Sequence, residues 1–330
     1  MPVSGYSADP RIRWTEWLPW IAAIAFFFLL PGYLSLGARI LIFILFALSL
    51  DLILGYAGIV TLGHSAFFGL GAYTAGALGA HTALTDPLAQ LAAAAALSAL
   101  LGAATGAVIL RTRALTLLML TLAITAILLE IANKWTSMTG GADGLSGVKV
   151  GEVLGLFRFD LYGKTAFLYC LIVLFIGWFF VRRLIYSPFG AMLTGIRENT
   201  ARMHAVGAPV YRRLVLVYTL SATLAGVAGA LLTQVNQFVG LNVLGLEPSG
   251  DLLVMLILGG VGRLYGAFVG PVVYLIAQDY LAKQYPEYWY LGIGLLLIFV
   301  VLFARGGILG ILDKWLPFSK PRSSAKASAR

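Results

Sequence analysis

Apolar runs long enough to cross a membrane make up most of this chain. A membrane-spanning helix needs about 20 apolar residues, and ten segments approach that length. They are residues 17–36, 38–55, 57–80, 88–110, 114–133, 165–184, 213–236, 250–261, 264–280 and 289–305. Charged residues make up only 11% of the chain, against roughly 25% in soluble domains. Because the backbone must satisfy its own hydrogen bonds in lipid, the sequence predicts an all-α integral membrane protein with about ten transmembrane helices, some short or broken.

The distribution of basic residues predicts which side of the membrane each loop faces. If the polar block 187–213 lies inside the cell, ten spans place both termini inside as well. The lysines and arginines then divide 17 to 6 between the inner and outer sides, which accounts for all 23 and satisfies the positive-inside rule. We expect a cytoplasmic N-terminal segment (1–16), a transmembrane domain (17–305) and a basic cytoplasmic tail (306–330).

A polar, basic block at residues 186–213 separates two of the apolar runs. Ser187 suits the N-cap of a helix, and Pro188 suits its first turn, where no amide donor is needed. Gly207 suits a left-handed residue that ends the helix. The block therefore predicts one amphipathic helix over 187–207, which either docks a soluble partner or lies on lipid headgroups with its arginines solvated. The candidate docking residues are Ser187, Pro188, Arg197, Glu198, Arg202 and Gly207.

Glycine-rich stretches occur in both halves of the chain. Residues 55–80 hold too many glycines for a plain helix, and such backbone is tolerated at membrane depth only where it is buried in protein or lines a cavity. Gly262, Gly266 and Gly270 recur at four-residue spacing, which allows close helix contact. Interrupted segments in both halves are typical of transporters. We expect the first stretch to line a substrate path and the second to pack helices, with packing and path lining as the respective alternatives.

Ionisable residues at membrane depth are candidates for function. Asp51 lies near the inner end of the second run, and His64 follows 13 residues later. The glycine-rich turn between them predicts that the two side chains pair, the alternative being that backbone groups satisfy each separately. On the outer side, TGGADGLSGV (139–148) predicts a tight turn, either an ordinary one or one whose amides meet a substrate carboxylate or a docked protein. The candidate path residues are Asp51, Gly55, Gly58, His64, Ser65, Gly140, Gly141 and Asp143.

Motifs for catalysis are incomplete. Residues 163–165 (GKT) end like a phosphate-binding loop, but Arg158 stands where that motif needs its first glycine. Residues 63–67 (GHSAF) lack the last glycine of a nucleophile elbow. The histidines and carboxylates have no metal-ligand spacing, and the one cysteine, Cys170, falls inside a span. We therefore expect a protein that is not an enzyme and that binds no metal or cofactor of its own.

Four ordered blocks carry a family resemblance. They are LDLILGYAGIVTLGHSAFFGLGAY (50–73), TGGADGLSGV (139–148), SPFGAMLTGIRENTARMHAVG (187–207) and LLVMLILGGVGRLYGAFVGP (252–271). Together with matching length and hydropathy, they cover roughly residues 35–305. On these blocks the chain resembles the LivM-type permease subunit of branched-chain amino acid ABC importers.

The resemblance implies a set of partners in the bacterial cytoplasmic (inner) membrane. A second, related permease would share the translocation path, two cytoplasmic ATPases would bind the ATP, and an extracytoplasmic binding protein would deliver the substrate. Lipid would surround the chain, and no nucleic acid is involved. The 187–207 block matches the loop that docks into the ATPase. Gly207 follows the family pattern, but residues 201–203 (ARM) replace its acidic-small-small triplet.

Substrate class and energy source remain open at this stage. Relatives carry leucine, isoleucine and valine, but also other amino acids, urea, short amides and carboxylates. A different class of protein, a self-sufficient secondary transporter driven by an ion gradient, is the main alternative, and a structural or enzymatic membrane subunit is another. The chain has few buried carboxylates that could face one another, and this favours an external energy source.

Overall fold

The computed structural model describes residues 14–82, 84–112, 115–152, 163–303 and 306–310. These residues form helices together with one isolated antiparallel bridge between Leu145 and Val239, which confirms the all-α prediction. The expected N-terminal segment 1–16 lies outside the described residues except for its last three, and the tail 306–330 lies outside them except for its first five.

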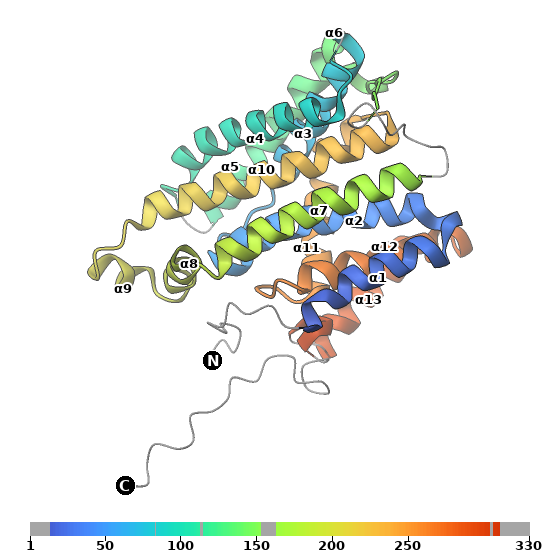
Figure 1. Cartoon of the computed structure of the whole chain (residues 1–330). Helices are drawn as coiled ribbons and strands as arrows, with labels where there is room; N and C mark the ends of the chain where they lie inside the picture. Colours follow the sequence, from blue (N-terminus) through green and yellow to red (C-terminus); the bar gives the residue numbers. More distant parts are fainter. Residues whose placement is uncertain (1–13, 83, 113–114, 153–162, 304–305, 311–330) are drawn as a thin grey trace.

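Thirteen α-helices follow one another along the described residues (Figure 1). In chain order they are α1 (Leu18–Leu29), α2 (Leu34–Asp51), α3 (Ser65–His81), α4 (Pro87–Ile109), α5 (Leu115–Lys134), α6 (Thr136–Thr139), α7 (Lys164–Ile185), α8 (Pro188–Glu198), α9 (Thr200–Ala205), α10 (Val210–Asn236), α11 (Leu246–Gly259), α12 (Gly266–Gln284) and α13 (Trp289–Phe303). The shorter 3₁₀ turns are η1 (Trp14–Trp17), η2 (Pro31–Tyr33), η4 (Gly141–Asp143) and η5 (Leu241–Leu244), and the π-helix is η3 (Leu52–Tyr56).

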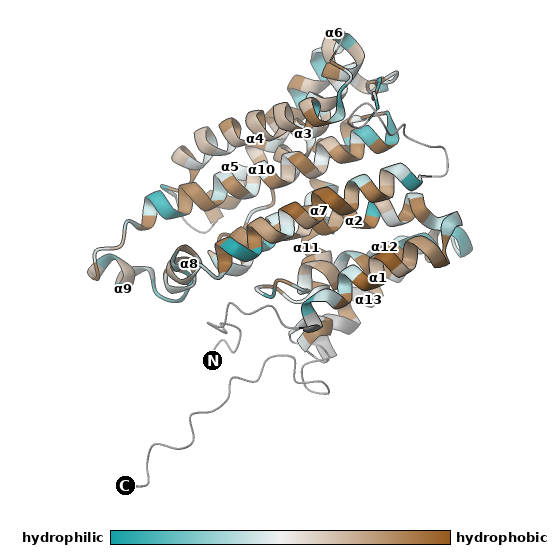
Figure 2. Cartoon of the chain, in the orientation of Figure 1, coloured by the Kyte–Doolittle hydropathy of each residue, from teal (hydrophilic) through white to brown (hydrophobic). Residues whose placement is uncertain are grey.

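Each of the ten predicted spans has a helix as its counterpart, but the lengths differ. By length and composition, five helical segments of the described residues suffice to cross a membrane. They are Pro31–Tyr56, Pro87–Ile109, Leu115–Lys134, Lys164–Ile185 and Val210–Asn236. The remaining counterparts are shorter or less apolar, and α1 has only 12 residues. Hydrophilic residues gather mainly near the helix ends (Figure 2).

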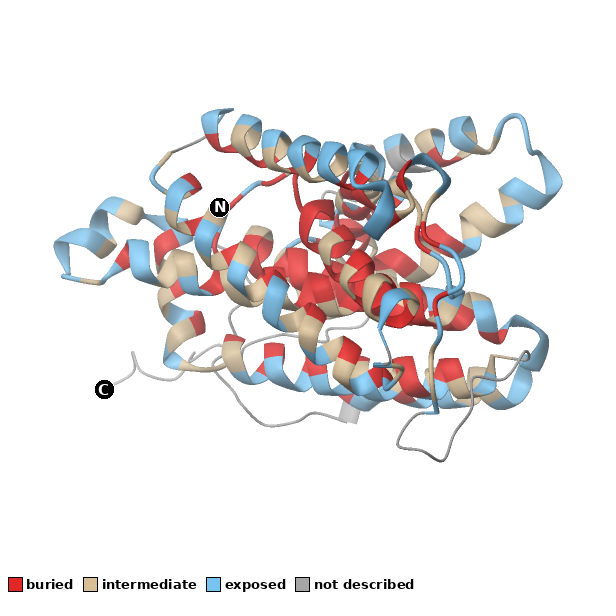
Figure 3. Cartoon of the chain, turned by 90° about the horizontal axis from the view of Figure 1, so that it is seen from above, coloured by how far each residue is buried: buried red, intermediate tan, exposed pale blue. Residues whose placement is uncertain are grey.

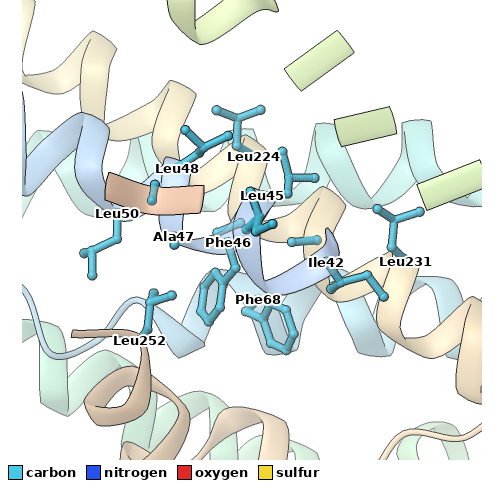
Figure 4. Packing of buried hydrophobic residues seen from close by; sticks show 14 of the residues in the cluster. Ile42, Leu45, Phe46, Ala47, Leu48, Leu50, Phe68, Leu224, Leu231 and Leu252 are labelled. Atoms are coloured by element: carbon cyan, nitrogen blue, oxygen red, sulfur yellow. The ribbon is translucent and has the colours of Figure 1, made fainter. Parts of the chain in front are cut away.

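Helix α2 lies at the centre of the bundle. It packs against α7, α10, α11 and α12, and α10 in turn packs against α3 and α4. Almost every residue of its second half is buried, and buried residues concentrate in the middle of the molecule (Figure 3). Phe46 of α2 stacks on Phe68 of α3, with 4.3 Å between ring centroids, and Leu231 and Leu252 lie close by in the same cluster (Figure 4). The single cysteine, Cys170 on α7, is completely buried.

Some predicted spans start at other residues than their helices, and the 38–55 and 57–80 spans show why. The 38–55 span starts earlier, because Pro31 opens the short turn η2 and α2 follows from Leu34. Proline has no amide hydrogen, so it suits a helix start and not a helix interior. The 57–80 span is wrong over its first eight residues, since 57–64 are irregular and α3 begins at Ser65. Gly58 adopts a left-handed φ of 74°, which a continuous right-handed helix does not contain.

The loops of the bundle lie at two ends, which we name after their short helices (Figure 1). The α8 end holds α8, α9, the C-terminal end of α2 and the turn between α11 and α12. The α6 end holds α6, η4 and the bridge between Leu145 and Val239. At the α8 end, Arg182 in the last turn of α7 forms a buried ion pair with Glu16, with 2.8 Å between Nε and Oε2.

Candidate functional site

Helix α8 begins where the sequence predicts. The Ser187 hydroxyl accepts a hydrogen bond from the Phe189 amide at 3.2 Å, and Pro188 occupies the first turn. This arrangement satisfies one of the amide donors that a helix start leaves open. The residues that α8 buries are Gly190, Leu193 and Ile196. Their spacing of three places one face of α8 against the protein.

The prediction of one continuous helix over 187–207 is wrong. Asn199 is extended, with φ −154° and ψ 93°, and it divides the block into α8 and α9. Its side chain accepts a hydrogen bond from the Arg202 amide at 2.9 Å. Asparagine side chains bond nearby backbone and compete with a continuing helix. The Asn199 side chain therefore caps α9 and takes the place of a backbone hydrogen bond that a continuous helix would have made.

Helix α9 ends as the sequence predicts. Gly207 has φ 84°, the left-handed conformation that residues with a Cβ avoid. Its amide donates to the His204 carbonyl, and the Ala208 amide donates to the Met203 carbonyl, both at 3.0 Å. These two bonds form a Schellman motif, which satisfies carbonyls at the end of the helix.

Helix α9 lies on the surface of the molecule. None of its residues is buried, and Arg202 is exposed, as is Glu198 at the end of α8. A Cβ on Gly195 of α8 would lie 2.9 Å from the Met203 sulfur, so Met203 holds α9 against α8. Of the six candidate docking residues, all except Ser187 are exposed.

Arg197 is exposed like Glu198 and Arg202, but its guanidinium bonds to the chain's own backbone. The Nη1 atom of Arg197 donates a hydrogen bond to the carbonyl of Gly55, 142 residues away in sequence. Gly58 lies under the aliphatic part of the side chain, since a Cβ at Gly58 would be 2.9 Å from the Arg197 Cγ. The two sequence-based alternatives, docking to a partner or free solvation, both miss this contact with the chain's own backbone.

Asp51 is bonded to a second backbone segment. Its Oδ1 accepts a hydrogen bond from the amide of Gly262 at 2.7 Å, in the turn between α11 and α12. We call the group of Asp51, Gly55, Gly58, Arg197 and Gly262 the arginine node. Sequence reasoning selected four of these residues and placed the fifth, Gly262, in a packing ridge.

The predicted pairing of Asp51 with His64 is wrong. The Nε2 atom of His64 lies 2.8 Å from the Ser49 hydroxyl, and the ring stacks on Phe46 with 5.5 Å between centroids. The Ser65 amide donates to the Ser249 hydroxyl at 2.9 Å. The side chains of His64 and Ser65 are enclosed within this chain, with 1% and 0% exposure.

Close packing explains most of the glycines. A Cβ at Gly71 of α3 would lie 2.0 Å from the Gly226 carbonyl oxygen of α10. By the same measure Gly270 lies 1.8 Å from the Met255 carbonyl oxygen of α11, and Gly266 lies 2.2 Å from the Gly260 carbonyl oxygen directly after α11. The packing expected for these two glycines is therefore observed. The prediction that Gly262 belongs to the same helix-packing ridge is wrong, because Gly262 lies in the turn between α11 and α12 with φ 76°.

The outer glycine motif forms the tight turn that the sequence predicts. Gly140 and Gly141 have φ values of 75° and 60°, and Asp143 is exposed in η4. Leu145 and Val239 then exchange backbone hydrogen bonds of 2.8 and 3.1 Å. This turn lies at the α6 end, so the structure does not bring these three candidate residues to the arginine node (Figure 1).

Comparisons with known proteins identify the family. Residues 32–301 match the family described as "Branched-chain amino acid transport system / permease component". The chain belongs to this family. It is 26% identical to the high-affinity branched-chain amino acid transport system permease protein LivM of Escherichia coli K12, over 94% of this chain and 76% of that protein. The resemblance inferred from the four sequence blocks is thus confirmed.

Further relatives of this permease family are also recognisable. LivM of Salmonella typhimurium is 26% identical over 93% of this chain and 75% of its own. A probable branched-chain amino acid transport permease protein LivH of Methanocaldococcus jannaschii is 28% identical over 59% of this chain and 64% of its own. No solved structure matches the chain significantly. The arginine node takes its residues from three of the four blocks that carry the resemblance, namely 50–73, 187–207 and 252–271.

Proposed function

We propose that this chain is a membrane subunit of an ATP-driven importer and forms part of the path for branched-chain or related amino acids. The observation that carries the proposal is the family match over residues 32–301. Its relatives are named as permease proteins of branched-chain amino acid transport systems. Five helical segments of spanning length and composition support residence in a membrane.

In this proposal the α8 end faces the cytoplasm of a bacterial cell and both termini lie on that side of the inner membrane. The excess of lysine and arginine expected on that side supports the orientation. Exposed apolar side chains along the long helices, such as Met119 and Ile127 of α5, would contact lipid or the second permease.

Two separate ATPases bind the ATP, and one of them docks at α9 of this chain. The support is geometric, because α9 is capped at both ends, buries none of its residues and projects beside α8. Glu198 and Arg202 are exposed there and offer charges to a partner surface. A binding protein would deliver substrate at the α6 end, where the turn at Gly140 and Gly141 lies.

Reconstitution tests the proposal. Proteoliposomes that hold this chain, the second permease and two ATPases, with ATP inside and leucine-loaded binding protein outside, should accumulate labelled leucine. Omitting the ATPases should abolish uptake. The neighbouring genes would supply the partner chains.

The alternative function, a secondary transporter driven by an ion gradient, would give a different result. This chain alone, in proteoliposomes with an imposed proton or sodium gradient, would then accumulate leucine without ATP, and the importer proposal would be wrong. ATP-driven uptake of urea, a short amide or a carboxylate, with no uptake of leucine, would keep the importer but replace its substrate.

A further inference from the structure

The arginine node joins three segments that are far apart in the sequence. Arg197 belongs to the last turn of α8, Gly55 belongs to the π-helix that extends α2, and Gly262 belongs to the turn between α11 and α12. The hydrogen bond from Arg197 to the Gly55 carbonyl makes the first connection. The hydrogen bond from the Gly262 amide to Asp51 makes the second.

The chemistry of the node favours a tight connection. Asp51 is 1% exposed, and its Oδ2 atom accepts no hydrogen bond from the residues that the structure describes. A carboxyl group at such depth needs hydrogen-bond donors; the Gly262 amide supplies one, and Arg197 bonds the neighbouring Gly55 carbonyl. Arginine is suited to this role because its guanidinium is always charged and offers several donors in a fixed plane.

Glycine makes the close approach possible. A Cβ on Gly55 would lie 2.1 Å from the Asp51 Oδ1 and 2.7 Å from the Gly262 Cα. A Cβ on Gly262 would lie 3.0 Å from the Arg197 Nη1. Any side chain at Gly55 would therefore push the three segments apart. The node requires glycine at Gly55 and Gly262, because both backbones lie against Arg197 or Asp51.

We propose that Arg197 is the positioning residue that transmits movement of α8 to α2 and to the α11–α12 turn. This inference rests on the proposed function, in which α8 and α9 respond to the ATPases. Because α2 is the central helix of the bundle, a displacement of α8 must either carry the Gly55 end of α2 with it or break the node. The node thus couples the docking region to a helix that packs against α7, α10, α11 and α12.

The test measures coupling and not only activity. In the reconstituted importer, the number of leucine molecules transported per ATP hydrolysed should fall roughly 5- to 150-fold for Arg197→Ala, the range of ordinary coupling energies. The ATPases should still copurify with the permease, because the Arg197 guanidinium bonds the Gly55 carbonyl and the exposed charges of Glu198 and Arg202 are retained. Arg212→Ala is the matched control, since Arg212 is exposed at the same end and forms none of the node's bonds. It should leave the ratio unchanged.

Two more variants guard against a purely structural effect. Arg197→Lys keeps the positive charge but loses the planar fork, so it should fold and give an intermediate ratio. Arg197→Ala combined with Asp51→Asn should lower the ratio by less than the product of the two single effects, because both residues act in one network.

The outcomes separate the inference from the proposed function. A wild-type ratio in folded Arg197→Ala or Arg197→Lys, with the ATPases bound, would overturn the inference alone. Loss of ATPase binding in these variants would also overturn it, since Arg197 would then belong to the docking surface. Failure of the wild-type permease to bind any ATPase would overturn the proposed function and this inference together.

Discussion

Helices α8 and α9 are consecutive and polar, but they relate to the rest of the molecule in opposite ways. Helix α8 buries Gly190, Leu193 and Ile196 and donates from Arg197 to the Gly55 carbonyl. Helix α9 buries none of its residues and is held by its caps and by the contact of Met203 with α8. The difference supports the proposed division of labour, in which α9 would meet the ATPase and α8 would pass its movement into the bundle.

Removing the buried side chain of Leu193 should have the largest effect on stability. Leu193 is fully buried on α8, and Leu→Ala changes at such sites cost about 2–5 kcal/mol because they leave a cavity. Val206, next to α9, is 77% exposed, so Val206→Ala should change stability by no more than about 0.5 kcal/mol. Thermal unfolding of the purified protein in detergent measures both. Equal effects would mean that α8 is not anchored as described.

Gly207→Val should destabilise α9 alone. The φ of 84° at Gly207 costs a residue with a Cβ about 1–2 kcal/mol, although a Cβ there would meet no atom within 4 Å. Hydrogen exchange of the α9 amides should accelerate while the unfolding temperature hardly changes. Gly207→Asn is the control, because asparagine tolerates the left-handed conformation. Acceleration of equal size in both variants would point to a cause other than backbone strain.

The two N-caps should separate local from global stability. Asn199→Ala and Ser187→Ala each remove a cap worth about 1 kcal/mol. Asn199→Ala should accelerate hydrogen exchange in α9 and leave α8 unchanged, because α9 buries none of its residues. Ser187→Ala should lower the unfolding temperature of the whole bundle, because α8 is packed against it. A global effect of Asn199→Ala would show that the two helices form one cooperative unit.

Arg202→Ala should have the smallest effect on stability, within about 0.5 kcal/mol, since Arg202 is exposed. If α9 docks the ATPases, the same change should weaken their binding, and added salt should reduce the difference between variant and wild type. Binding can be measured by titrating the ATPase onto permease in nanodiscs. Unchanged binding at low salt would remove Arg202 from the docking surface.

Local signals predicted the ends of the 187–207 block but not its middle. Ser187 with Pro188, and Gly207, act through backbone bonds to their immediate neighbours, so their roles are readable in the sequence. Asn199 caps α9 from inside the block, and nothing in the surrounding residues distinguishes that use from an ordinary helical position. The sequence selects Arg197 only as a docking candidate, because its hydrogen-bond partner lies 142 residues away and no local pattern reports such a contact.

The glycine-rich segment shows the same limit. Its composition predicted correctly that residues 55–80 would not form a plain helix, because Gly58 is left-handed. The partners of Asp51 and His64 could not be predicted, since they depend on how α2 packs against α10 and α11. Proximity in sequence suggested a pair, but tertiary packing supplied Gly262 and Ser49 instead.

The complete burial of Cys170 makes this permease convenient for spectroscopy. It is the chain's single cysteine and has no exposed surface, so water-soluble maleimide and methanethiosulfonate reagents should leave the folded protein unlabelled. A cysteine introduced at Val206 would then carry a spin label or fluorophore at one known place beside α9. Distances from that label to a second one on the α6 end would record the displacement of α9 during turnover, without first removing a native thiol.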